Sequence, residues 1–190
     1  MTERLIVDAD ACIKLGGSEK YHFLYQLIPL LTKKAYIHKY VYDYEILTPA
    51  SVKTQLNKLV SEGILEIIDE SGLSLFERTI FDAVYRNLAR VTINANNPNK
   101  NRGEVSSLAI AKTLSIPVFF TDERDLQPII DRVLNSGLDD IICIRIVDVI
   151  EKIKRGEIEG FGRKQAKVLW AISEKDTGLF DKKIWPITTK

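Results

Sequence analysis

Short apolar runs alternate with helix-like patterns along most of this chain, and that alternation restricts the fold more than any other feature. The runs that fit strands are rich in β-branched residues, as buried strands tend to be. They lie at 4–7, 35–38, 64–68, 117–121 and 141–146. Strands that alternate with helices form βαβ units, so the sequence predicts an α/β fold with a mainly parallel sheet of five strands.

Apolar residues recur at helical spacing between these strands. One stripe comprises Val52, Leu56, Leu59 and Val60, and a second comprises Phe76, Ile80, Val84 and Leu88. Further helices are expected at 104–114, 126–134, 147–154 and 164–173. The pattern changes beyond Gly160, which predicts a main domain over 1–160 and a C-terminal helix and tail over 161–190 that pack on it.

Composition limits the class of protein but not its ligand. The chain has 190 residues, of which 45% are apolar and 28% charged, and its net charge of +1 neither suggests nor excludes nucleic acid as a partner. Its two cysteines, Cys12 and Cys143, fit buried thiols in a reducing compartment. Neither a signal peptide nor a membrane-spanning segment is recognisable, so we expect a cytoplasmic protein without a membrane partner.

Carboxylates follow the predicted strands at the points where those strands end. Asp8 follows the run Leu5-Ile6-Val7, Asp122 ends the run from Pro117, Glu104 opens a helix after Gly103, and Glu45 lies just past strand 35–38. The carboxyl ends of parallel strands share one edge, and ligands bind there. Carboxylates gathered on that edge repel one another unless a cation is present, and oxygen ligands suit Mg²⁺ or Mn²⁺. The pattern predicts a metal-dependent phosphodiesterase site.

Simpler roles are open for several of these acids. Asp8 is costly to bury without a ligand or hydrogen bond, which favours function, although it could also cap the helix that follows. Asp10 fits a cap as well as a metal ligand. Glu104 in a first helical turn interacts favourably with the helix dipole. For Asp125, capping and metal chemistry carry equal weight.

Taken together and in order, these segments resemble the PIN-domain nuclease family. The resemblance rests on Leu5-Ile6-Val7-Asp8-Ala9-Asp10, an acid after strand two, Gly103-Glu104 with Ser107-Leu108-Ala109-Ile110-Ala111, and Thr121-Asp122-Glu123-Arg124-Asp125-Leu126. It covers roughly residues 1–150. It implies a three-layer α/β/α fold and Mg²⁺- or Mn²⁺-dependent cleavage of RNA. Many members of the family are toxins of bacterial toxin–antitoxin pairs.

Site roles follow from the resemblance residue by residue. Asp8, Glu104 and Asp122 match the metal ligands of the family, Asp125 matches an additional acid, and Thr121 matches a hydroxyl position beside the site. The second acid departs from the family pattern. Tyr42-Asp43-Tyr44-Glu45 offers Glu45 or Asp43, whereas alignment on the next helix would place the neutral Gln55 there. Glu45 is preferred because 35–38 is the better second strand.

Candidate substrate contacts lie near the predicted acids. Lys100 and Arg102 flank Glu104 and are placed to reach a phosphate, as could a stripe of arginines at 78, 86 and 90. Tyrosines at 36, 40, 42 and 44 suggest base stacking, but their spacing also fits a half-buried segment, and packing is the favoured interpretation.

The predicted function is a divalent-metal-dependent ribonuclease, of toxin type, that binds RNA, an antitoxin protein and a second copy of itself. One alternative is a haloacid-dehalogenase-like phosphatase, since Asp8-Ala9-Asp10 fits its motif, although Cys12 stands where that family has Thr or Val. The other alternative is a degenerate PIN module that binds RNA or a partner protein without cleavage.

Overall fold

The computed structural model describes residues 1–93, 100–173 and 175–186. They divide into two compact units, Met1–Cys143 and Ile144–Lys190. The division falls earlier than the boundary at residue 160 expected from the sequence. The helix at Ile146–Lys154 contacts the helix at Arg163–Ile172, and therefore belongs to the second unit.

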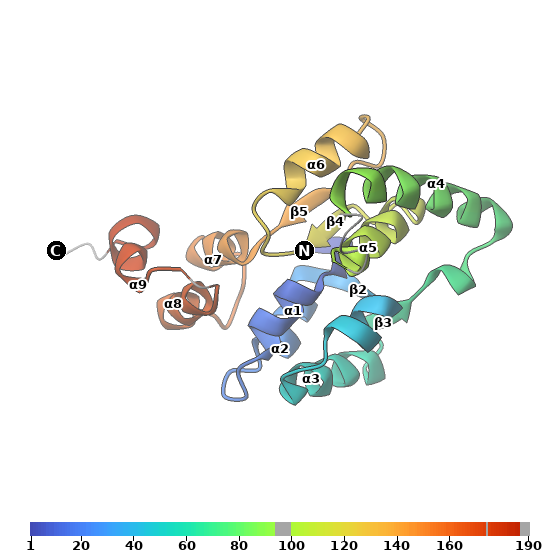
Figure 1. The fold of residues 1–190 in the computed structure, drawn as a ribbon. Coiled ribbons are helices and arrows are strands. Elements are labelled where there is room, and N and C mark those ends of the chain that lie inside the picture. The colour runs from blue at the N-terminus through green and yellow to red at the C-terminus, as the bar shows by residue number, and fades with distance from the viewer. Residues whose placement is uncertain (94–99, 174, 187–190) are drawn as a thin grey trace. The chain divides into compact units, whose positions relative to one another are not determined.

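A parallel sheet of five strands forms the centre of the first unit (Figure 1). Its strands are β1 (Thr2–Val7), β2 (Thr32–His38), β3 (Leu65–Ile68), β4 (Val118–Phe120) and β5 (Ile142–Ile144). Their order across the sheet is β3-β2-β1-β4-β5. In register, Val7 lies beside Ile37 on one side and beside Phe120 on the other. The carboxyl ends of β1, β2 and β4 therefore meet at the same edge.

Helices cover both faces of this sheet, which confirms the three-layer α/β/α fold. One face carries α1 (Ala9–Gly16), α2 (Phe23–Leu31) and α3 (Ala50–Ser61), and the other carries α4 (Leu75–Thr92), α5 (Arg102–Thr113) and α6 (Leu126–Val133). Helices α4, α5 and α6 share one apolar core with Ile6 and Phe119 of the sheet. Side chains alternate along a strand, so Leu5 and Val7, both fully buried, face α1–α3.

Local sequence explains why the elements near the site begin where they do. Strand β1 is central in the sheet. Its last three residues are all apolar because a central parallel strand is buried on both faces. Helix α4 begins with a capping box in which the Ser74 and Glu77 side chains each bond the other's backbone amide. Helix α5 is buried at every position from Gly103 to Ala111, which places Glu104 inside the protein from the first turn.

The tyrosine-rich segment after β2 is helical rather than extended. A π-helical turn, η1 (Val41–Glu45), follows His38 within three residues. Tyr40 and Tyr44 therefore share a face, with ring centroids 5.1 Å apart, and the Tyr42 hydroxyl instead donates to Asn57. Of the four tyrosines named from the sequence, Tyr36 lies in β2, and Tyr40, Tyr42 and Tyr44 lie in the helical segment after it.

The second unit contains helices α7 (Ile146–Lys154), α8 (Arg163–Ile172) and α9 (Thr177–Leu179) and a π-helical turn, η3 (Phe180–Ile184). Phe180 is fully buried, and its ring centroid lies 6.3 Å from that of Trp170 and 6.4 Å from that of Trp185. Asp181 pairs with Arg163 and Lys167 of α8, which ties η3 to that helix. In the part of the chain that the structure describes, no helix is both long and apolar enough to pass through a bilayer.

Candidate functional site

Asp8 lies where β1 and β4 end together. Its backbone amide donates to the Phe120 carbonyl at 2.9 Å, and the residue is only 5% exposed. It stands at the N-cap position of α1 but its side chain does not cap that helix. The carboxylate instead accepts a hydrogen bond from the Thr121 hydroxyl at 3.2 Å. Thr121, which is fully buried, therefore orients Asp8.

Burial and neighbouring acids make Asp8 hard to ionise. Burial is the largest cause, and the charges of Glu45, Glu123 and Asp10 add to it, so that the pKa of Asp8 rises to about 7. A hydrogen bond from the backbone amide of Ala9 lowers the pKa and offsets part of this rise. Without a cation, Asp8 therefore titrates near neutral pH rather than near 3.8.

Glu104 in the first turn of α5 shares this environment. The residue is 7% exposed, and burial raises its pKa to about 8, with further contributions from the charge of Asp8 and from the charge and a hydrogen bond of Glu123. Without a cation, Glu104 therefore keeps its proton at neutral pH.

Glu45 reaches the same place from η1 because Gly103 has no side chain. Its Oε1 accepts a hydrogen bond from the Gly103 amide at 3.1 Å. A Cβ atom at position 103 would collide with the Glu45 carboxylate. Burial raises the pKa of Glu45, and the Gly103 bond partly opposes that rise. Gly103 therefore allows the close approach of Glu45, and Glu104 contributes a buried acid.

One pocket of about 140 Å³ joins these side chains. Its lining residues are Asp8, Ala9, Asp10, Glu45, Asn101, Glu104 and Glu123. We call it the acidic pocket. Glu123 was not among the predicted site residues, although its place directly after Asp122 at a strand end was a usable signal. The structure thus brings together Asp8, Glu45 and Glu104 with one acid that the sequence did not single out.

A lysine pairs with Asp10, which lines the pocket, and with Asp122, which does not. Lys14 Nζ lies 3.0 Å from Asp10 Oδ2 and 3.2 Å from Asp122 Oδ2. Burial opposes the Lys14 charge, but the two carboxylates outweigh it and raise its pKa. Asp122 is buried and lies two residues past the end of β4, yet it is engaged by Lys14 and does not line the acidic pocket. Lys14 was not predicted, although its spacing of four residues from Asp10 suggests a pair.

The structure places other predicted residues away from the acidic pocket. Asp125 is exposed at the N-cap position of α6, and its side chain does not cap that helix. Asp43 pairs with Lys39 instead. Lys100 and Arg102 are exposed just before and at the start of α5.

Gln55, the neutral alternative to Glu45, is bonded to the backbone of two neighbouring helices and does not line the acidic pocket. It is 3% exposed, its amide donates to the Gly16 carbonyl at 2.9 Å, and its oxygen accepts from the Tyr25 amide at 3.1 Å. It joins α3 to α1 and α2. Of the two alignments weighed from the sequence, the one with Glu45 matches the residue that lines the acidic pocket.

The acidic pocket has the donor atoms of a metal site but not its spacing. Among the residues that the structure describes, no three His, Cys, Asp or Glu side chains are spaced to hold an ion as they stand. The donor chemistry nevertheless fits a hard divalent cation, since the polar side chains include carboxylates from four segments. Two of them have a pKa raised to about 7 and about 8, partly by mutual repulsion that a cation would relieve. Binding would require the carboxylates to move closer together.

Comparisons with protein-family models, with curated proteins and with solved structures found no match to this chain.

Proposed function

We propose that this protein is a Mg²⁺- or Mn²⁺-dependent ribonuclease whose centre is the acidic pocket. The observation that supports it is the convergence of Asp8, Glu45, Glu104 and Glu123 on one pocket at the carboxyl edge of a parallel sheet. This edge is where α/β proteins bind their ligands. Asp8 and Glu104 are buried, and buried acids that repel one another are costly for folding, which supports a functional role for the pocket.

The chain's own residues would hold and orient the reacting groups. Asp8, Glu45, Glu104 and Glu123 would provide oxygen ligands, with Thr121 fixing Asp8 and Gly103 fixing Glu45. A bound divalent cation polarises a phosphate and lowers the pKa of a water ligand. Lys14 holds Asp10 and Asp122, which limits the negative charge around the pocket. The resemblance to PIN-domain nucleases implies products with a 5′-phosphate and a 3′-hydroxyl.

The resemblance to PIN-domain nucleases supports the choice of RNA as substrate. It is carried by the motif residues of this sequence, because the comparisons add no relative. Asp125 as a further ligand, an antitoxin partner, a homodimer and a cytoplasmic location stay predictions of that resemblance.

A cleavage assay tests the proposal directly. Purified protein is incubated with end-labelled single-stranded RNA, with Mg²⁺, with Mn²⁺ or with a chelator. We expect cleavage only with the divalent ion, and loss of cleavage in Glu104→Gln. Glu3→Gln, which changes an exposed acid at the start of β1, is the control and should cleave like the parent. Cleavage that survives in the chelator or in Glu104→Gln would contradict the proposal.

The two alternatives predict different results in the same assay. A phosphatase would release phosphate from a small phosphomonoester and leave RNA intact. Asp8 and Asp10 both line the pocket, as that reaction would need, but Asp10 is held by Lys14. A degenerate module would bind the RNA without cutting it under any of these conditions.

Glu45→Gln should weaken Mn²⁺ binding by about 10-fold or more, the scale found when a metal site loses a supporting group. A neutral amide replaces one of the anionic oxygens on which affinity depends. Gln55→Ala should leave the affinity unchanged but destabilise the fold by about 1–3 kcal/mol, because the Gly16 carbonyl and the Tyr25 amide lose their buried partner. Calorimetry measures the first effect and urea unfolding the second. Equal affinity in Glu45→Gln and the parent would remove Glu45 from the site.

A further inference from the structure

A second pocket, of about 460 Å³, begins one residue from the acidic pocket along η1. Tyr44 lines it, whereas the next residue, Glu45, lines the acidic pocket. The two pockets are adjacent along α5 as well, where Arg102 belongs to the larger pocket and Glu104 to the acidic one. Both pockets are therefore lined by η1 and by the first turn of α5.

Most charges in the larger pocket are already engaged by neighbours. Lys39 pairs with Asp43, Asp69 accepts from Ser71, and Arg78 bonds Asp82. Arg102 differs from these residues. Its guanidinium lies 4.7 Å from the centre of the Tyr40 ring, and no carboxylate among the described residues pairs with it. Arg102 is therefore the cation that this pocket offers to an anionic ligand, while the carboxylates of Asp69 and Glu70 also line it.

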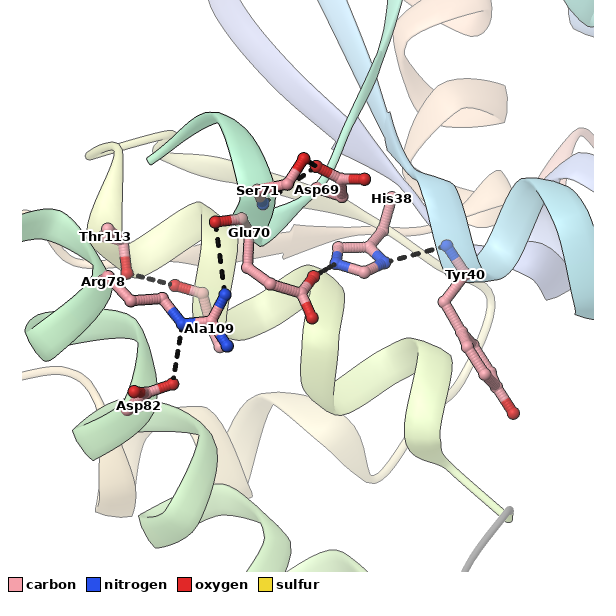
Figure 2. A network of polar contacts seen from close by, with 9 residues as sticks. All are labelled: His38, Tyr40, Asp69, Glu70, Ser71, Arg78, Asp82, Ala109 and Thr113. Carbon is pink, nitrogen blue, oxygen red and sulfur yellow. Dashed lines mark hydrogen bonds and ion pairs between the residues drawn. The ribbon is translucent and has the colours of Figure 1, made fainter. Parts of the chain in front are cut away.

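A buried histidine fixes the aromatic side of this pocket. The His38 ring is 3% exposed, and Figure 2 shows it between the Glu70 carboxylate and the backbone nitrogen of Tyr40. Nδ1 accepts the Tyr40 amide hydrogen at 3.1 Å, so the ring proton lies on Nε2, 3.4 Å from the Glu70 carboxylate. Burial lowers the pKa of His38, which keeps the ring neutral and the Tyr40 bond intact. The backbone at the start of η1 is thus held in place.

Tyr44, four residues after Tyr40, presents an open aromatic surface. The residue is 66% exposed, and its ring is tilted by 38° against Tyr40. Tyr40 in turn carries Arg102 on its ring. An exposed aromatic ring next to a free cation is the pair of features by which proteins bind single-stranded nucleic acid: bases stack on the ring, and the cation contacts the backbone.

We infer that the larger pocket binds the nucleotide adjacent to the cleaved bond of single-stranded RNA, with its base against Tyr44 and its phosphate on Arg102. The inference rests on the proposed function for the identity of the ligand. It adds a binding subsite that is separate from the carboxylates, and it gives Tyr44 a role in binding rather than in packing.

Binding is measured on Glu104→Gln protein, which cannot cut the probe, by anisotropy of an end-labelled hexauridylate without divalent ions. Tyr44→Ala should weaken binding by about 10-fold, the order expected for one lost stacking contact, whereas Tyr44→Phe should bind like the parent. Arg102→Ala should weaken binding. It should also make the negative slope of log K against log salt less steep by about 0.7, the value for one phosphate of a single strand. Leu47→Ala, at an exposed residue outside both pockets, is the control and should change neither quantity.

The results separate this inference from the proposed function. Unchanged binding in Tyr44→Ala, or an unchanged salt slope in Arg102→Ala, overturns the subsite even if the protein cleaves RNA. An equal loss in Tyr44→Phe and Tyr44→Ala also overturns it, because the contact would then depend on the hydroxyl. Conversely, the expected pattern in a protein that never cleaves RNA would retain the subsite and contradict the ribonuclease.

Discussion

Asp8→Asn will reduce metal-dependent RNA cleavage by at least about 100-fold, the upper end of what loss of even an outer partner costs a metal site. Asp8 is the most enclosed acid of the pocket, and the substitution removes its charge with almost no change in shape. At pH 8 without metal, the melting temperature should hold or rise, because the fold no longer contains a buried carboxylate that is repelled by its neighbours. Both effects are measurable on one preparation, by an RNA cleavage assay and by a thermal melt.

The matched control is Asp139→Asn, at an exposed position whose positive φ asparagine tolerates. It should cleave and melt like the parent. Full cleavage by Asp8→Asn would show that Asp8 is not a ligand. A large fall in its metal-free melting temperature would show instead that the charge of Asp8 stabilises the fold.

The metal-free protein should lose stability as the pH rises from about 4.5 to about 8. The pKa of Asp8 is about 7 against 3.8 for an ordinary aspartate, and that of Glu104 is about 8 against 4.5 for an ordinary glutamate. Both folded values are raised, so the native state binds more protons across this range. The stability that these groups contribute is complete below the ordinary values and is lost as the pH rises through the folded ones. The slope should be on the order of 1 kcal/mol per pH unit for each group.

Urea unfolding in a chelator at several pH values measures this slope. The double variant Asp8→Asn/Glu104→Gln should show a flatter profile, which isolates the two groups from others that titrate. Saturating Mn²⁺ should reverse the parent's trend, because the ion binds the ionised carboxylates. Identical profiles for the parent and the double variant would contradict the assignment of both pKa values.

The fold was predictable because its signals are periodic and local. Apolar spacing in 52–60 and 76–88 corresponds to α3 and α4, and each of the five expected strands overlaps an observed one. Parallel order then follows from the alternation of strands and helices. The domain boundary was less predictable, since α7 is grouped with α8 by contacts between the two helices, which the local pattern of neither helix specifies.

The candidate site was predictable only where position along a strand determines it. Asp8 and Asp122 lie at the same edge because β1 and β4 are parallel neighbours, and that follows from the pattern. Sequence does not specify which side chain turns inward. Lys14 engages Asp122 across 108 residues, and Glu45 enters the pocket only because η1 is helical and position 103 is glycine.

The π-helical turn η1 constrains the number of residues between His38 and Glu45 as well as their identity. It positions Tyr44 in one pocket and Glu45 in the other, so the two environments are one peptide bond apart. Inserting or deleting one residue between His38 and Glu45 would rotate both side chains out of place at once, whereas many single substitutions would affect only one of them. In a library of variants, this segment should tolerate substitutions far better than changes of length.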